Sequence, residues 1–150
     1  MNLNKTFRLI ALGACLLGLS ALASQKNPVA RPYKDYGQAI LVVNLQTGYF
    51  EGTILTHGTH IGLATITMVG HMDLETSTVD EIEATVTAAN GDQLFIELID
   101  GVNKIVDGTG RFEGATGELS SGEFIDLQAT TDYPYMTMTY GIKTEGTLIY

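Results

Sequence analysis

The sequence predicts an all-β fold, a closed antiparallel β-barrel of about eight strands. Apolar and polar residues alternate with a period of two in several segments after residue 37, as in strands that cover a core with one face. No window after residue 23 has a convincing helical period. Seven to nine strand segments follow one another at short spacing, and such an array forms a sandwich or a closed barrel.

The first residues predict a secretory signal peptide over 1–23. Lys5 and Arg8 make a basic start, an apolar run follows, and Ala21-Leu22-Ala23 has the small-x-small pattern of a signal peptidase site. The apolar run is shorter than the roughly 20 residues that a membrane-spanning helix needs. We therefore expect cleavage between Ala23 and Ser24, a secreted or periplasmic protein, and no integral membrane segment after signal removal.

Cys15 offers an alternative, because Leu12-Gly13-Ala14-Cys15 resembles a bacterial lipobox. Lipidation at Cys15 would anchor the protein to a membrane. However, the longer apolar run follows Cys15, whereas apolar residues belong before a cleavage point. Cleavage after Ala23 is therefore favoured, and it would leave a chain without cysteine, disulfide or zinc–thiolate site.

The charge of the mature chain is strongly negative. Lys5 and Arg8 leave with the signal peptide, so six cations against 17 acidic residues give a net charge of −11. Such a surface repels nucleic acid and anionic lipid, and we expect neither as a partner. The remaining length suits one domain. We assign residues 24–35, which are polar and contain two prolines, to an N-terminal arm, and residues 36–150 to a single barrel domain.

The first predicted strands follow in order. Residues 38–46 are apolar on both faces, so this strand is expected to be covered on both sides. Thr47-Gly48 is a turn signal, and residues 49–56 form the next strand. Residues 61–74 make a long strand in which Gly70 suggests a bulge or bend. A strand this long favours closure, because an open sheet would expose its edges.

A hairpin is predicted in the middle of the chain. Residues 81–89 alternate cleanly, and Asn90-Gly91 favours a type I′ turn with two positive-φ residues. Residues 93–99 form the returning strand. The segment 108–117 contains four glycines, which exclude a helix and predict a tight turn that feeds a short strand. The final strands are expected over 117–129, 135–140 and 142–150.

The segment Gly-Thr-Gly-Arg-Phe-Glu-Gly-Ala-Thr-Gly over 108–117 resembles the glycine-rich signature of the allene oxide cyclase barrel-like superfamily, which includes the plant dirigent proteins. Residues 58–62, 88–94 and 146–150 are similar to small secreted bacterial proteins of that type. The resemblance implies an eight-stranded barrel with an apolar interior, often trimeric in the plant members. In the family the cavity shapes a reactive hydrophobic intermediate. No segment matches the catalytic motifs of the cyclases, so no catalytic residue and no cofactor are predicted.

Two acidic residues in apolar strands are candidate site residues, Glu97 and Asp126. If Glu97 pointed inward, burial would raise its pKa and make it a general acid or base. If the face with Leu94, Ile96 and Leu98 points inward, Glu97 is solvated. We favour the second arrangement, because it buries three aliphatic side chains.

Further candidate site residues lie at or beside the aromatic residues Phe112 and Tyr140. Arg111 and Glu113 flank Phe112, and on a strand they would share one face. They could form a charged pair at the barrel mouth, but a surface ion pair with Phe112 packed in the core is favoured. Tyr140, together with the tyrosines and methionines of 133–138, could line an adaptable apolar mouth, although core packing is the favoured interpretation.

Metal binding is weakly supported. His57, His60 and His71 are the only constellation with metal-like spacing, and no carboxylate accompanies them at ligand spacing. No segment has the Asp-x-Asp-x-Asp-Gly spacing of a calcium loop. We therefore predict no metal site.

Three functions are compatible with these features. The first is a non-enzymatic barrel that binds a small apolar ligand or has an accessory role. The second is an isomerase or cyclase of the allene oxide cyclase or dirigent type acting on a hydrophobic intermediate. The third is a self-associating structural protein, a homo-trimer or homo-dimer. The candidate ligand-binding residues are Glu97, Arg111, Phe112, Glu113, Asp126 and Tyr140.

Overall fold

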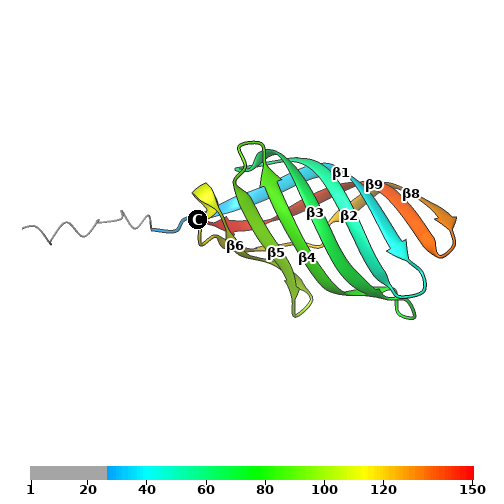
Figure 1. Cartoon of the computed structure of the whole chain (residues 1–150). Coiled ribbons are helices and arrows are strands. Elements are labelled where there is room, and N and C mark those ends of the chain that lie inside the picture. The colour runs from blue at the N-terminus through cyan, green and yellow to red at the C-terminus, as the bar shows by residue number, and fades with distance from the viewer. Residues whose placement is uncertain (1–26) are drawn as a thin grey trace, which may run out of the picture.

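The computed structural model describes residues 27–150 (Figure 1). The predicted signal peptide, its cleavage site at Ala23 and Ser24, and Cys15 lie outside the described residues. The described chain is built from strands and one short 3₁₀ turn, η1 (Gly110–Phe112). The strands are β1 (Ala30–Asn44), β2 (Tyr49–Gly58), β3 (Gly62–Asp73), β4 (Thr78–Ala88), β5 (Gln93–Ile99), β6 (Val102–Gly108), β7 (Thr116–Leu119), β8 (Glu123–Asp132) and β9 (Tyr135–Ile149).

The sheet closes on itself, so the predicted antiparallel barrel is confirmed. The strand order is β1-β2-β3-β4-β5-β6-β7-β9-β8, and β1 also pairs with β9. Eight strands therefore form the closed barrel, all pairs are antiparallel, and β8 is an extra strand on β9 (Figure 1). Consecutive strands from β1 to β7 are neighbours, as in a meander of hairpins.

β1 begins earlier than the sequence predicts. Residues 30–35, which we assigned to a polar arm, pair with residues 149–144 of β9 and belong to the barrel. Tyr33 and Asp35 of this segment point inward and are buried. The predicted cover on both faces of residues 38–46 is also wrong, because Ile40 on the outer face is 57% exposed. One face of the strand covers the core and the other meets solvent.

Two hairpin turns differ from the predicted chemistry. Asn90-Gly91 does join β4 to β5, but only Gly91 has a positive φ, of 89°, so the turn is not type I′. The turn with two positive-φ residues is at Asp100 (53°) and Gly101 (75°), between β5 and β6. β6 itself was not predicted, although Asp-Gly is a strong hairpin signal.

The last strands are divided differently from the prediction. The segment 117–129 is not one strand, because the chain leaves the barrel wall at 120–122. β7 pairs with residues 146–149 of β9, and β8 pairs with residues 135–143 of the same strand. The predicted strands 135–140 and 142–150 are accordingly one continuous strand, which pairs with β1 over its full length.

The glycine-rich segment closes one end of the barrel with Phe112. Gly110 and Gly114 have φ values of 61° and 72°, in the left-handed region that favours glycine. The Asp107 carboxylate accepts hydrogen bonds from the Gly108 and Gly114 amides, at 2.7 and 3.0 Å. This tight turn presses the Phe112 ring into the core, where the residue is 1% exposed.

We predict that Phe112→Ala lowers the free energy of unfolding by about 3–5 kcal/mol, because it opens a cavity in a packed core. Phe124→Ala is the matched control. Phe124 is 60% exposed and makes an edge-to-face contact with Tyr140, so its loss should cost at most about 1.5 kcal/mol. Denaturant unfolding of both variants measures the difference, and equal costs would show that Phe112 does not pack as described.

Candidate ligand-binding cavity

The barrel interior contains a cavity of about 620 Å³ that is partly open to solvent. Its volume lies within the range of roughly 300–1,000 Å³ that small-molecule sites occupy. Inward-facing aliphatic side chains of β1, β2, β3, β5 and β9 form most of the wall, among them Leu41, Ile54, Ile66, Ile96, Met138 and Ile142.

The cavity reaches the surface through the side of the barrel. β8 is hydrogen-bonded only to β9, and β6 pairs with β7 only over Asn103–Ile105, so no ladder joins β6 to β8. The first residues of β4, 78–82, likewise pair only with β3. Val79, Phe124 and Leu127 line the cavity and are also substantially exposed. They mark the opening.

A β-bulge in β8 shapes this opening. Ile125 pairs with Gly141 and Gln128 with Thr139, which leaves Asp126 and Leu127 both opposite Tyr140. Asp126 has a φ of 52°, a left-handed conformation that Asp tolerates better than most residues. The extra residue turns Leu127 toward the cavity. Asp126 itself is exposed and does not line the cavity, so its part in a ligand site stays a prediction.

A buried carboxyl–phenol pair lies in the cavity wall. The Tyr33 hydroxyl donates a hydrogen bond of 2.9 Å to the Asp35 carboxylate. Burial raises the pKa of Asp35 above its ordinary value, while hydrogen bonds from Tyr33 and Thr144 act in the opposite direction. Burial and the nearby Asp35 also raise the pKa of Tyr33. Neither residue was a sequence candidate, because both lie in the segment that we assigned to an arm.

Tyr140 also lines the cavity. It is 6% exposed, its ring lies edge-to-face against Phe124 with the centroids 4.9 Å apart, and burial raises the pKa of its hydroxyl. Met138 lines the cavity beside it, whereas Tyr133 and Tyr135 are exposed. Part of the predicted tyrosine and methionine cluster is thus brought to the cavity, and a ligand contact by Tyr140 stays a prediction.

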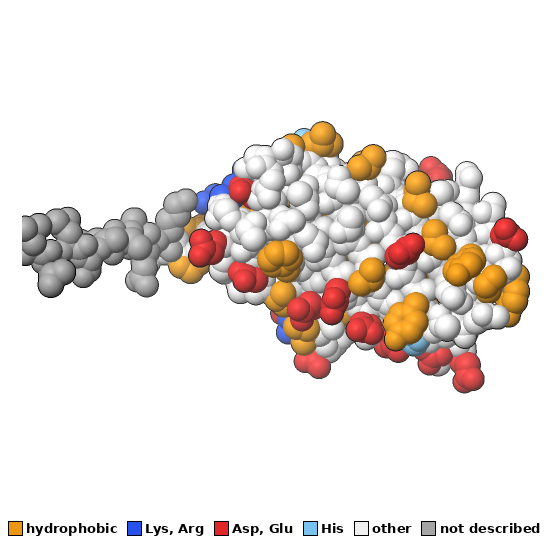
Figure 2. All heavy atoms as spheres, viewed as in Figure 1, with side chains coloured by type: hydrophobic (Ala, Val, Ile, Leu, Met, Phe, Trp, Pro, Cys, Tyr) orange, Lys and Arg blue, Asp and Glu red, His pale blue; other side chains and the backbone are white. Residues whose placement is uncertain are grey.

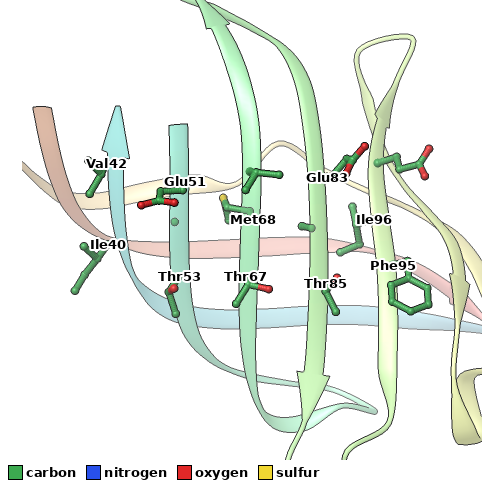
Figure 3. Close-up of a pocket in the computed structure, with 14 residues that line it drawn as sticks. Ile40, Val42, Glu51, Thr53, Thr67, Met68, Glu83, Thr85, Phe95 and Ile96 are labelled. Carbon is green, nitrogen blue, oxygen red and sulfur yellow. The ribbon is translucent and has the colours of Figure 1, made fainter. Parts of the chain in front are cut away.

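Glu97 lies on the outer face of the barrel. Leu94 and Ile96 point inward and are buried, so the favoured orientation of this strand is confirmed and an inward Glu97 is wrong. Glu97 lines a groove of about 800 Å³ on the outside of β1–β5. Figure 3 shows Thr53, Thr67 and Thr85 in one row across this groove, with Glu51 and Glu83 in the next.

The outer groove is a weaker candidate than the barrel interior. It is open to solvent, and three carboxylates lie in one cross-strand row of its lining, from Glu51 past Val69 to Glu83 and Glu97. Apolar ligands are held by burial against apolar walls, and the lining of the interior cavity is more apolar than that of the groove.

The predicted pair of Arg111 and Glu113 does not form on a strand, because residues 110–112 are a 3₁₀ turn. The Arg111 side chain instead lies 3.5 Å from the Asp92 carboxylate and stacks over the Phe112 ring at 4.6 Å. Glu113 is exposed. Phe112 is a core residue, as the favoured interpretation has it, and neither charged residue lines the cavity. A ligand contact by these three residues stays a prediction.

The three histidines are not brought together. His60, at the β2–β3 turn, contacts the Pro32 carbonyl at 3.1 Å, and His57 is exposed nearby. His71, near the other end of β3, contacts Asp80 at 2.8 Å, and Asp80 raises its pKa. Within residues 27–150 no group of three metal-type ligands converges.

Comparisons with known proteins do not indicate a function for this chain. No family model matches this chain, and neither the curated proteins nor the solved structures include a match. The resemblance to the allene oxide cyclase barrel-like superfamily therefore stays a prediction from the sequence. In residues 27–150 no helix is long and apolar enough to span a membrane.

We predict that Asp35→Asn raises the free energy of unfolding at pH 7. Burial raises the pKa of Asp35 in the folded protein, so folding favours the neutral carboxyl group. This contribution to stability is fully present below the ordinary aspartate pKa of about 4, and it is lost as the pH rises through the raised pKa. The amide has the same shape and does not ionise. The difference from the wild type should therefore shrink as the pH falls toward about 4.

Glu97→Gln is the control, because it removes one negative charge from the outer face and should change stability by no more than about 0.5 kcal/mol. Denaturant unfolding between pH 4 and 8 measures both variants. A difference for Asp35→Asn that does not vary with pH would contradict the assignment.

Proposed function

We propose that this protein is a secreted or periplasmic barrel that binds a small apolar ligand in its interior. The observation that carries the proposal is the cavity of about 620 Å³ with aliphatic walls and an opening between β8 and the β4–β6 side of the barrel. A barrel of eight strands is just wide enough to be filled by its own side chains or to hold one small ligand. The location outside the cytoplasm rests on the signal-like N-terminal sequence.

Several features of the wall support binding. The lining is mainly aliphatic, so a ligand would bury apolar surface on entering. Polar residues are a minority of the lining: the Tyr33–Asp35 pair, Thr144 and Tyr140, together with Thr78, Asn103, Ser120 and Ser121. A small number of polar groups in an apolar pocket is the usual means of orienting a ligand. The exposed apolar residues at the opening provide a path along which such a ligand could enter.

The test uses N-phenyl-1-naphthylamine, a neutral apolar dye whose fluorescence rises when water is excluded. We expect saturable binding to the wild type with one site per chain. Ala84→Phe places a ring in the cavity and should weaken dye binding about tenfold or more, because Ala84 is an inward-facing cavity residue.

Thr85→Phe is the matched control, because Thr85 is the next residue of β4 and points to the outer groove. Unfolding curves show that each variant is folded. Loss of dye binding in both folded variants, or in neither, would overturn binding inside the barrel. An absence of saturable binding to the wild type would have the same consequence.

An isomerase or cyclase is the second candidate function, and Asp35 is the observation that favours it. A buried carboxyl group with a raised pKa keeps a neutral fraction at higher pH and can donate a proton to a ligand oxygen. We expect such an activity to convert an apolar epoxide into an isomer of equal mass. Gas chromatography after incubation detects the isomer, and Asp35→Asn should abolish the conversion. A wild type that returns the epoxide unchanged would contradict this candidate.

A further inference from the structure

We propose that the barrel cavity selects apolar amines, in which a hydrocarbon body fills the cavity and a protonated amino group pairs with the Asp35 carboxylate. The inference rests on the proposed function, since it specifies the ligand class of the same cavity. It is carried by the charge of the cavity lining, by the hydrogen-bonding capacity of the groups around Asp35, and by the net negative charge of the protein.

The lining contains a single ionisable carboxyl group and no base. Asp35 is the only Asp or Glu among the residues of 27–150 that line the cavity, and none of those residues is Lys, Arg or His. Asp35 is 9% exposed. Buried carboxylates are normally paired with a cation, and this one is accompanied only by neutral donors, the Tyr33 hydroxyl and the side chain and backbone of Thr144. A cationic ligand would supply the missing charge.

Hydrogen-bonding capacity distinguishes the amine from other head groups. Asp35 accepts a hydrogen bond from Tyr33, and the side chain and backbone of Thr144 act on it as further donors, so about one of the roughly four acceptor positions of an ionised carboxylate stays free. An ammonium group offers three donors and a positive charge, whereas a hydroxyl offers one donor and no charge. A ligand carboxylate offers only acceptors and would lie in the same apolar cavity as Asp35 without a countercharge. The expected order of affinity is therefore amine, then alcohol, then carboxylate.

The protonation states of the cavity agree with this order. Burial raises the pKa of Asp35, so the free cavity holds this carboxylate under a desolvation penalty that a paired ammonium would relieve. The other ionisable groups that line the cavity are Tyr33 and Tyr140, and burial raises the pKa of both. Both therefore stay neutral at pH 7, which leaves Asp35 as the lining group with which a cation can pair.

The net charge of the protein favours a cation as well. Three acids, Asp80, Asp100 and Glu123, adjoin cavity-lining residues near the opening. Two bases, Lys104 and Lys143, do so as well, and Asp80 contacts His71, so the acidic excess at the opening itself is small. Figure 2 shows many acidic and few basic side chains over the face of β1–β5, and the whole chain carries a net charge of −9. A field of this sign raises the local concentration of cations and repels anions.

The experiment compares octylammonium, octanol and octanoate as competitors of N-phenyl-1-naphthylamine at pH 7. Their chains are equal, so differences report the head group. For the wild type we expect octylammonium to displace the dye at roughly a tenfold lower concentration than octanol, because its ammonium group forms a charged hydrogen bond with Asp35. Octanoate should be the weakest of the three. Asp35→Asn should bring octylammonium to within about threefold of octanol and leave octanol itself nearly unchanged.

Glu97→Gln removes the same charge from the outer face and should keep the wild-type order. If the dye binds but octylammonium and octanol compete equally in the wild type, the amine inference is wrong and the apolar cavity stands. The inference is equally wrong if Asp35→Asn retains the amine preference. If the dye itself fails to bind, the proposed function fails as well, so the two failures are distinguishable.

Discussion

The pairing of β1 with β9 is the constraint on which the rest of the structure depends. It joins the first and last strands over their whole lengths, from Ala30 opposite Ile149 to Asn44 opposite Tyr135. Without it the sheet would have two long unpaired edges, which invite association with other chains. Closure also gives every strand of the barrel an inside and an outside, so the alternation along each strand becomes a division between core and solvent.

The closed barrel is packed at one end and hollow beyond it. Phe112, Leu94 and Leu148 pack at the end that the glycine-rich turn covers, and all three are almost fully buried. Further along the wall several inward positions carry small side chains, such as Ala39, Ala84 and Gly52. Of these, Ala84 lines the cavity, where a larger side chain would fill part of the space. The packed end of the core stabilises the fold, and the hollow part leaves room for a ligand.

The candidate site depends on two departures from a regular barrel. The first is the break at 120–122, where β7 ends and β8 takes its place along β9, so that the wall is open on one side. The second is a carboxyl group, Asp35, at an inward position that a simple core would give to an aliphatic residue. A buried polar group of this kind costs stability unless it is paired, and such costs are common at binding sites. The opening gives access to the cavity, and Asp35 places a carboxyl group inside it.

The sequence by itself determined the features that depend on neighbouring residues. Alternation identified most strands, Asn90-Gly91 located a hairpin, the apolar face of Leu94 and Ile96 was correctly placed inward, and the glycines of 108–117 predicted a tight turn. Only the tertiary structure decided that 30–35 is a strand, because its hydrogen bonds come from β9, more than a hundred residues away. It also decided that Asp35 faces the cavity while Asp126 and Glu97 do not. The bulge at Asp126 and the cavity volume depend on strands that are far apart in the sequence. A pattern of neighbouring residues therefore cannot predict them.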